Sequence, residues 1–368
     1  MVYNWQHPDW PHFVYDVEDL QPLIIELAHE AGEANGMVLG LPEGLKQEAL
    51  LQLMLSEAVK TSEIEGEFIS SEDVMSSIRN NLGLNDDPVF IKDKLAGGVA
   101  QLMIEVRKSF NEPLHLDTLL NWHRMLMAGV KHINSGQWRT GTEPMQVVSG
   151  AYGRETIHYE APPSPEVPKQ MERFVHWYNN GTFPLKGGVA EAVLKSAVAH
   201  LYFESIHPFE DGNGRIGRAV AEKALSQSMG RPVMLSLSKI IEGDKAAYYR
   251  ALKEAQRSLE ITDWVHYFAS VILAAQRDAK EMVGFTLKKA IFFDRYRALL
   301  NERQLKAINK MLEKGIEGFE GGMTAKKYMS ITKTSKATAT RDLQELQQMG
   351  LLRQEGAGRA VRYQLNLG

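Results

Sequence analysis

Two apolar stripes on either side of a glycine-containing loop constrain the fold of this chain most. Upstream of the loop, apolar residues recur in pairs at helical spacing, namely Val193, Leu194, Ala197, Val198, Leu201 and Tyr202. Downstream, Ile216, Val220, Ala224 and Leu225 continue that spacing until Gly230 and Pro232, which signal a stop. Each stripe covers one broad helix face, which has to be buried. The sequence therefore predicts two core helices joined by a loop.

This loop and the start of the second helix carry residues suited to holding phosphates. Gly212 and Gly214 let the backbone bend so that its N–H groups face an anion. Arg215 and Arg218 stand three residues apart, on one face of a helix expected to begin near Arg215, where both can hold phosphate oxygens. The positive end of that helix points at the same anion. Asp211 is a hard oxygen ligand, suited to the Mg²⁺ that accompanies polyphosphates.

His207, which opens the loop, titrates near neutrality and can take the proton of an attacking hydroxyl. Taken singly, a histidine before a proline is typical of a turn, and a G-x-G sequence is typical of an ordinary loop. Their joint occurrence within residues 207–218 favours nucleotide binding with transfer of part of the nucleotide.

Residues 207–218 read His-Pro-Phe-Glu-Asp-Gly-Asn-Gly-Arg-Ile-Gly-Arg. They resemble the signature of the Fic family (filamentation induced by cyclic AMP), H-x-F-x-[DE]-G-N-G-R-x-x-R, at every defined position. The resemblance implies a mainly α fold, with a helical Fic core and a β-hairpin flap. It also implies AMPylation, in which a Ser, Thr or Tyr hydroxyl of a target protein attacks the α-phosphate of ATP and pyrophosphate leaves.

The same resemblance assigns a role to each position of the motif. His207 would be the general base, Phe209 a buried anchor of the loop, and Asp211 the ligand of Mg²⁺ between the α- and β-phosphates. The anion hole would consist of Gly212, Asn213 and Gly214. The β-phosphate would be held by Arg215 and the γ-phosphate by Arg218. ATP and Mg²⁺ are thus the expected cofactors.

Residues 136–163 interrupt the helical pattern. The β-prone runs Val147-Val148 and Thr156–Tyr159 are separated by residues 149–153, which predicts a hairpin. By itself this is typical of a plain surface hairpin. In Fic proteins a hairpin at this place, the flap, pairs with the target segment by strand addition. The residues expected to bind the target are Val148, Ile157 and His158.

An upstream segment, Thr61-Ser62-Glu63-Ile64-Glu65-Gly66, follows an amphipathic helix that includes Leu51–Val59. Alone it is typical of a helix end with solvated acids. It resembles the inhibitory motif of Fic proteins, [ST]-x-x-x-E-[GN]. The resemblance implies that Glu65 pairs with Arg218 and occupies the place of the γ-phosphate, because arginine and carboxylate form strong, oriented pairs.

Two further features resemble parts of Fic proteins. Tyr248 and Tyr249 stand where these proteins often carry a tyrosine pair near the adenine, although such a pair on an amphipathic helix equally indicates core packing. The aromatic opening of the chain, with Trp5, Trp10 and Phe13, resembles the region that precedes some Fic cores.

The C-terminal part has a different character. Helices are expected around Leu305–Leu312, at Met323–Met329 and at Ser335–Met349 with Ser335 as N-cap, followed by strands at Leu351–Arg353 and Val361–Leu365. This order resembles a small winged helix-turn-helix domain. Residues 323–368 hold eight Lys or Arg against three Asp or Glu, a net charge of +5, which favours DNA contact. A protein-interaction or dimerisation module with solvated lysines is the alternative.

Composition limits the remaining classes. The net charge of −4 argues against a globally basic nucleic-acid binder, and the absence of cysteine excludes disulfides and thiolate metal sites. No signal peptide and no membrane helix of roughly 18 apolar residues is expected, which predicts a cytoplasmic protein without a membrane partner. A homodimer is left open.

Three regions are expected: an N-terminal helical region over 1–95, a Fic catalytic core over 96–290 and a winged helix over 295–368. The leading hypothesis is an autoinhibited protein adenylyltransferase. The first alternative is another Fic-type activity, either phosphate or phosphocholine transfer or removal of AMP; the intact Arg215 and Arg218 favour a triphosphate. The second is a DNA-binding regulator with the Fic core as nucleotide sensor, which would not need His207 as a base.

Overall fold

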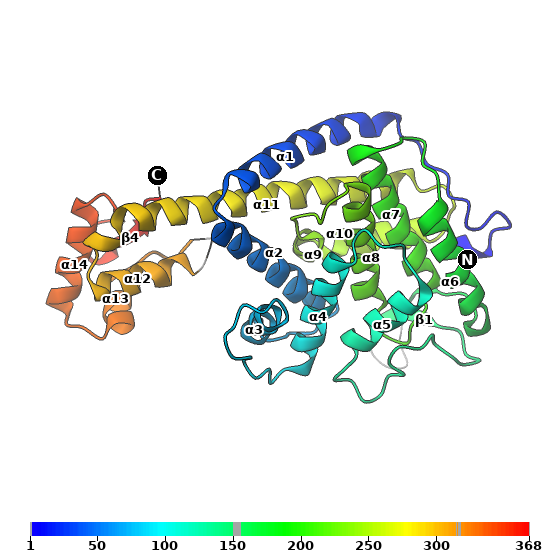
Figure 1. Cartoon of the computed structure of the whole chain (residues 1–368), viewed down its shortest axis with the longest axis horizontal. Helices are drawn as coiled ribbons and strands as arrows, with labels where there is room; N and C mark the ends of the chain where they lie inside the picture. Colours follow the sequence, from blue (N-terminus) through cyan, green and yellow to red (C-terminus); the bar gives the residue numbers. More distant parts are fainter. Residues whose placement is uncertain (1, 150–155, 314, 316–317, 368) are drawn as a thin grey trace. The chain divides into compact units, whose positions relative to one another are not determined.

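The computed structural model of the chain describes residues 2–149, 156–313, 315 and 318–367. The fold is mainly helical, as expected, with two small sheets (Figure 1). It divides into two compact units, one comprising residues 1–33 and 50–279 and the other residues 34–49 and 280–368. The boundaries expected at residues 95 and 290 stay predictions. None of the helices over the described residues is long and apolar enough to span a membrane.

Three helices contain residues of both units: α1 (Gln21–Gly40), α2 (Glu43–Ile64) and α11 (Thr262–Tyr296). The larger unit also contains the 3₁₀ helices η1 (Asn4–Gln6), η2 (Glu18–Leu20) and η3 (Ser164–Glu166). Its other α-helices are α3 (Ser71–Asn81), α4 (Lys94–Lys108), α5 (Leu116–Leu126), α6 (Val167–Asn180), α7 (Gly188–Ile206), α8 (Asn213–Ser228), α9 (Leu237–Gly243) and α10 (Lys245–Ala255).

The two helices expected around the loop are α7 and α8, which lie side by side in the larger unit (Figure 1). From Ala192 to its end, α7 is buried apart from Lys195, so it is covered on nearly all sides rather than on one stripe. Helix α8 begins at Asn213, two residues before the expected start near Arg215. It ends at Ser228, followed by Gly230 at φ +68°, as the stop signal predicted.

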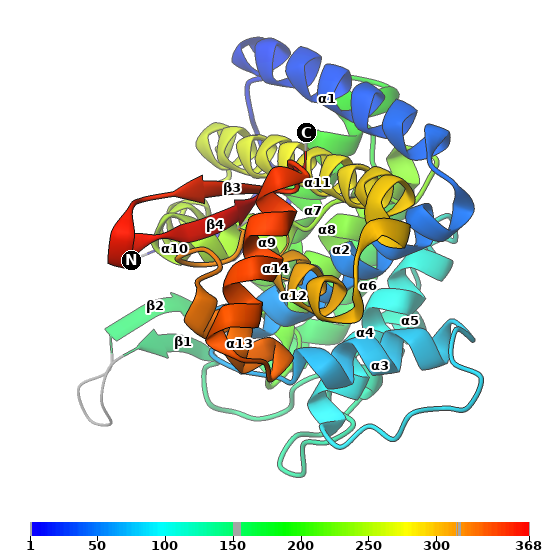
Figure 2. The same ribbon diagram turned by 90° about the vertical axis from the view of Figure 1, so that its left-hand side faces the viewer.

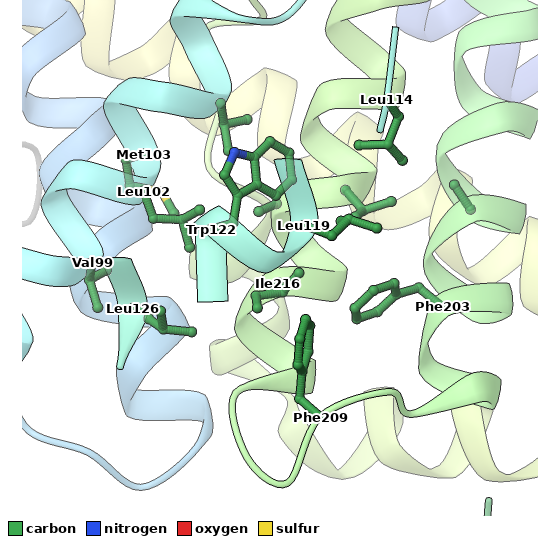
Figure 3. Close-up of a cluster of buried hydrophobic side chains, with 14 of the residues drawn as sticks. Val99, Leu102, Met103, Leu114, Leu119, Trp122, Leu126, Phe203, Phe209 and Ile216 are labelled. Carbon is green, nitrogen blue, oxygen red and sulfur yellow. The ribbon is translucent and has the colours of Figure 1, made fainter. Parts of the chain in front are cut away.

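Phe209 anchors the loop in the core, as the resemblance implied. Its ring is completely buried and stacks on the imidazole of His123 with the ring centroids 4.0 Å apart. Figure 3 shows Phe209 beside Phe203 of α7 and Ile216 of α8, with Leu126 of α5 nearby. This packing fixes the middle of the loop to the helices on both sides of it.

The expected hairpin is present. Strand β1 (Gln146–Ser149) pairs antiparallel with β2 (Thr156–Glu160), and Val148 stands opposite Ile157. Of the segment expected to separate the strands, residues 150–153 lie outside the described residues, and Ser149 ends β1. The buried Tyr159 hydroxyl donates to the Ser205 carbonyl at 2.5 Å, which ties β2 to the end of α7. Both strands can be followed in Figure 2.

In the smaller unit, η4 (Arg297–Leu299) and helices α12 (Glu302–Leu312), α13 (Ala325–Thr332) and α14 (Lys336–Gln348) are followed by an antiparallel pair (Figure 2). This pair consists of β3 (Leu352–Glu355) and β4 (Arg362–Leu365), with η6 (Gly358–Ala360) between them. The order of three helices and a hairpin is the expected one. Assignment to the winged-helix class stays a prediction.

Two helix starts in this unit show which hydrogen bonds decide the boundaries. Ser335 caps α14 by accepting from the Thr338 N–H, as expected. The start expected for α13 at Met323 is wrong, because the Met323 N–H donates to the Tyr363 carbonyl at 2.8 Å and thus pairs with β4. Thr324 then caps the helix, which begins at Ala325.

The close packing of α4 on α5 gives a test of the fold. Gly98 faces α5, and a Cβ atom there would lie 2.3 Å from the Met125 carbonyl oxygen. We expect Gly98→Ala to lower the free energy of unfolding by about 1–3 kcal/mol, as overpacking of a core does. Gly97→Ala is the matched control, since its Cβ would meet only Ile91 at an ordinary 3.7 Å. In urea unfolding, equal losses from the two variants would contradict this packing.

Candidate active site

The backbone of the loop presents His207 at the end of α7 in a left-handed conformation, with φ 50° and ψ 61°. Arg139 stabilises this conformation by donating from Nε to the His207 carbonyl at 2.7 Å. Its Nη2 also reaches the Ile206 carbonyl at 3.3 Å, and its backbone N–H donates to Pro208. The guanidinium is buried, so these bonds are shielded from water. Sequence analysis missed Arg139.

The imidazole of His207 is held neutral. Burial lowers its pKa to about 4, and the positive charge of Arg139 lowers it further, while a hydrogen bond to the Glu204 carbonyl acts in the opposite direction. At pH 7 this ring therefore carries no charge and can accept a proton. Since one ring nitrogen is engaged by the carbonyl, the other is the one available as a base.

Gly212 closes the loop and begins α8. It lies at φ +81°, and a Cβ atom would come within 2.4 Å of Met127 and 3.0 Å of Leu126, so a larger residue would clash. As N-cap it offers no side-chain acceptor to the first N–H groups of α8. This helix N-terminus is thus a place where an anion is favoured.

Asn213 holds the loop in shape through its side chain. Its Oδ1 accepts from the Phe209 N–H at 2.9 Å, and its Nδ2 donates to the Phe209 carbonyl at 2.8 Å. Both polar ends of the buried amide are thereby used within the loop. The amide side chain shapes the expected anion hole, and only the backbone of Asn213 can line it.

The carboxylate of Glu65 lies at the N-terminus of α8. A Cβ atom on Gly214 would meet Glu65 Oε1 at 2.2 Å, so Gly214 leaves the space that this carboxylate fills. Arg218 Nη2 donates to the same oxygen at 2.8 Å. The structure therefore brings together Glu65 and Arg218, as the resemblance implied, and places a carboxylate where phosphate oxygens were expected.

Arg218 is almost completely buried and makes two further bonds to the end of α2. Its Nε donates to Thr61 Oγ1 at 2.8 Å, and its Nη2 donates to the Thr61 carbonyl at 2.9 Å. Thr61 is the first residue of the segment that resembles the inhibitory motif. Both defined side chains of that segment, Thr61 and Glu65, therefore contact one arginine.

Arg215 is paired with a second carboxylate, which the sequence did not reveal. Its Nη1 forms a short ion pair with Glu67 Oε2, and its Nη2 lies 3.5 Å from Asp211 Oδ1. Arg215 is 1% exposed. Burial raises the pKa of Glu67, Arg215 opposes the rise, and the charges of Asp211 and Glu65 add to it. The one feature of the sequence that could have pointed to Glu67 is that it is a second glutamate, two positions after Glu65.

Asp211 is the most accessible carboxylate of the loop, with half of its side chain exposed. Its Oδ1 accepts from the Gly212 N–H at 2.6 Å. An exposed carboxylate at the mouth of an anion site can supply one hard oxygen to Mg²⁺, with phosphate oxygens and water as the other ligands. Over the residues that the structure describes, no group of three or more His, Asp or Glu forms a complete protein cage for a metal.

The two tyrosines expected near the adenine differ in their surroundings. Tyr248 is buried, and its hydroxyl lies 2.9 Å from His200 Nε2. Tyr249 is 43% exposed, and its hydroxyl donates to the Ile64 carbonyl at 3.4 Å. Tyr248 thus packs in the core, whereas Tyr249 offers a ring edge beside the end of α2; a role in nucleotide binding stays a prediction for both.

The hairpin residues expected to bind a target include two exposed apolar side chains. Val148 is 46% exposed and its partner Ile157 is 48% exposed. His158, the next residue, is partly buried. Because the sheet has only two strands, its outer edges can pair with an added strand.

Two family models match the chain. The model of the Fic/DOC family matches residues 113–225, which include the whole loop. A model described as a domain of unknown function, DUF4172, matches residues 3–84, which include Glu65 and Glu67. The Glu65–Arg218 and Glu67–Arg215 pairs therefore each join residues of the two matched regions.

Curated relatives are named protein adenylyltransferases. Protein adenylyltransferase fic-1 of Caenorhabditis elegans is 27% identical over 161 residues, which are 43% of this chain and 27% of the worm protein. Protein adenylyltransferase Fic of Culex quinquefasciatus is 24% identical over 284 residues, 73% of this chain and 53% of that protein. The matches thus span between about a quarter and a half of these relatives.

A solved structure shares the fold over almost the entire chain. The crystal structure of a Fic family protein from Desulfovibrio desulfuricans G20 has a TM-score of 0.52 and 20% sequence identity. The match covers 97% of this chain and 98% of that one.

Proposed function

We propose that this chain is a protein adenylyltransferase, which transfers AMP from ATP to a hydroxyl of a target protein. The proposal starts from the match of residues 113–225 to the Fic/DOC family model. One observation carries the proposal. A neutral histidine stands at one end of the loop, and two buried arginines follow at the start of α8, around an anion position that a carboxylate occupies. A general base next to a phosphate site is what nucleotidyl transfer requires.

In this reaction His207 takes the proton of a Ser, Thr or Tyr hydroxyl. The hydroxyl oxygen forms a bond to the α-phosphorus, and the bond between that phosphorus and the bridging oxygen to the β-phosphate breaks. The electron pair leaves with pyrophosphate, whose charge Arg215 and Arg218 hold. Such reactions depend mainly on positioning and charge neutralisation, which two buried guanidiniums and a helix N-terminus supply.

Asp211 is the residue that would hold Mg²⁺. Its side chain is half exposed and its Oδ1 lies 3.5 Å from Nη2 of Arg215, the residue proposed to hold the β-phosphate. Mg²⁺ would supply charge neutralisation on the α- and β-phosphate oxygens.

The hairpin would hold the target by strand addition. Backbone hydrogen bonds to an edge fix the register of an extended segment, and side chains such as Val148 and Ile157 contact its alternate residues. The bond from Tyr159 to the carbonyl of Ser205 ties this edge to the end of α7, two residues before His207. A target hydroxyl would therefore be presented at a fixed place relative to the base.

The state described is autoinhibited in this proposal. Glu65 occupies the oxygen position on Arg218 and the N-terminus of α8 that the γ-phosphate would need. Glu67 occupies Arg215 in the same way. Productive binding of ATP thus requires both carboxylates to leave their arginines.

The alternatives are separated by what is transferred. Phosphate or phosphocholine transfer and removal of AMP would use the same histidine, but two arginines fit a triphosphate better than a shorter ligand. A nucleotide-sensing regulator would not need a neutral base beside the phosphate site. These alternative activities predict different patterns of protein labelling when ATP carries the label at the α- or at the γ-phosphate.

The first prediction therefore concerns labelling. With a lysate as the source of targets, [α-³²P]ATP should label protein and [γ-³²P]ATP should not. His207→Ala should reduce α-labelling by about a hundred-fold or more, because a general base is lost. Binding of ATP, followed in a filter assay, should stay nearly constant. Labelling by the γ-phosphate alone would make the chain a phosphotransferase instead.

The second prediction concerns the two carboxylates. Glu65→Ala should raise α-labelling by about ten-fold or more, since a charge-assisted bond to Arg218 no longer competes with ATP. Glu67→Ala alone should raise it less, because Glu65 stays in place, and the double variant should exceed Glu65→Ala. Initial rates and the KM for ATP measure this.

Glu63→Ala is the matched control for these variants. Its carboxylate pairs with Lys60 at 2.6 Å, whereas the ion pairs described for the two arginines involve Glu65, Glu67 and Asp211. A rise in activity from Glu63→Ala that equals the rise from Glu65→Ala would show that loosening of α2, not release of Arg218, activates the enzyme.

DNA is proposed as a further partner of the C-terminal unit. Lys333, at the C-terminal cap of α13, and Lys336 of α14 are exposed, as is Arg341 of α14, whose Nε lies 4.0 Å from Glu345. In the hairpin, Arg353 and Arg362 both pair with Glu355. The third prediction is that the full chain binds duplex DNA with an affinity that falls steeply with salt. Lack of binding even at low salt would favour an interaction module.

A further inference from the structure

A buried carboxyl group, that of Glu204, lies beside His207 on the last turn of α7. Glu204 is 4% exposed, and its Oε2 lies 3.8 Å from His207 Nδ1. The backbone carbonyl of Glu204 also accepts a hydrogen bond from the His207 ring. Both the main chain and the side chain of Glu204 therefore lie next to the imidazole.

The fold makes room for this carboxyl without giving it a conventional partner. A Cβ atom on Gly217 would lie 2.3 Å from Glu204 Oε1, so the absence of a side chain there admits the carboxyl between α7 and α8. Within the part of the chain that the structure describes, Oε1 has no hydrogen-bond partner. A buried carboxyl that lacks a bond is costly, which favours a role at the site over a role in stability.

We propose that Glu204 is a positioning residue for His207: its backbone carbonyl keeps the ring proton on the nitrogen that it bonds, and its side chain, once ionised, stabilises the imidazolium formed during transfer. The inference rests on the proposed adenylyl transfer. As the target oxygen bonds to the α-phosphorus, its proton moves to Nε2 and the ring becomes positively charged. The carboxylate 3.8 Å from Nδ1 then faces a charge of opposite sign, and the ring loses the proton to solvent afterwards.

The charge state of Glu204 makes the proposal measurable. Burial raises the pKa of Glu204 to about 8, the negative charge of Glu65 adds to the rise, and Arg218 opposes it. In the state described, the carboxyl is therefore neutral at pH 7 and becomes charged as the pH rises through about 8. Removal of Glu65 eliminates one cause of the rise, so this ionisation should then occur at lower pH.

Several other groups act on this pair and have to be constant between variants. Those that interact electrostatically with Glu204 or His207 are Glu65 after α2, Arg139 before β1, Tyr159 of β2, Asp211 of the loop, Arg218 of α8, and Tyr248 and Tyr249 of α10. In the kinetic comparison Glu65 is replaced in both members, so that Glu204 alone differs between them and the other groups stay unchanged.

The fourth prediction compares Glu65→Ala with Glu65→Ala/Glu204→Gln. In the parent, kcat for α-phosphate transfer should rise by about ten-fold with pH as Glu204 ionises, because an opposite charge within about 4–6 Å strengthens the base. The Gln variant should stay at the low value across this range, with its KM for ATP unchanged. A merely structural role would change stability and KM without removing the pH step.

A second readout does not depend on activity. In ATP-free protein with labelled histidine, the His207 ring signal, identified by its loss in His207→Asn, should show a titration step near pH 8. The step should disappear in Glu204→Gln and move to lower pH in Glu65→Ala. Gly217→Ala, which displaces the carboxyl but keeps its charge, should shrink the step.

Glu222→Gln is the matched control. Glu222 is also a buried glutamate, but it belongs to α8. Burial raises its pKa to about 7, and its carboxyl lies 3.5 Å from Arg107. Its substitution should affect stability but leave the His207 step in place. The inference is overturned if Glu204→Gln keeps both the step and the pH-dependent rise. If Glu65→Ala transfers no label at all, the proposed function fails, while the ring titration still decides the role of Glu204.

Discussion

The packing of α7 against α8 is the constraint on which the site depends. Two left-handed residues, His207 and Gly212, mark the ends of the loop between these helices, and the buried ring of Phe209 pins its middle to the core. A histidine in this conformation needs its surroundings to hold it there. Arg139 and Asn213 do so through bonds to the loop backbone, so the base and the anion position have one fixed geometry.

The same geometry buries two positively charged side chains at the start of α8. Arg215 and Arg218 are each 1% exposed, and a buried guanidinium without a counter-charge is strongly unfavourable. The counter-charges come from Glu67 and Glu65, which belong to the short segment after α2. The burial that would make the arginines good phosphate ligands in the proposed function therefore also explains why carboxylates of the chain itself pair with them.

Much of this arrangement could be predicted because its signals are local. Helical periodicity identified α7 and α8, and glycine at a forced turn identified the beginning of the anion site. The Glu65–Arg218 pair was expected only through resemblance to a motif, since 153 residues separate its members. Glu67, Arg139 and Glu204 had no such motif. Their roles depend on which side chains the folded core brings together, and no periodicity records that.

The boundaries that were misplaced have the same cause. The start of α13 was expected at Met323, but a strand that comes 40 residues later takes its N–H. The start of α8 was placed near Arg215 because the glycines suggested a loop, whereas Gly212 alone makes the turn. Tertiary pairing and a single φ value decided both positions, over local propensity.

At the end of α2, the proposed inhibitory segment shares hydrogen-bond donors with the proposed nucleotide site. The last carbonyls of a helix have no partner within it and need donors from elsewhere. Here Arg218 donates to the carbonyl of Thr61, Lys245 to that of Glu63 and Tyr249 to that of Ile64. In the proposed function Arg218 binds phosphate, and Tyr249 is one of the two tyrosines predicted to lie near the adenine. A nucleotide that recruits these two donors would withdraw them from α2 and free the carbonyls next to Glu65. The nucleotide and the inhibitory segment would then compete for the same hydrogen-bond donors, in addition to competing for the positive charge of Arg218.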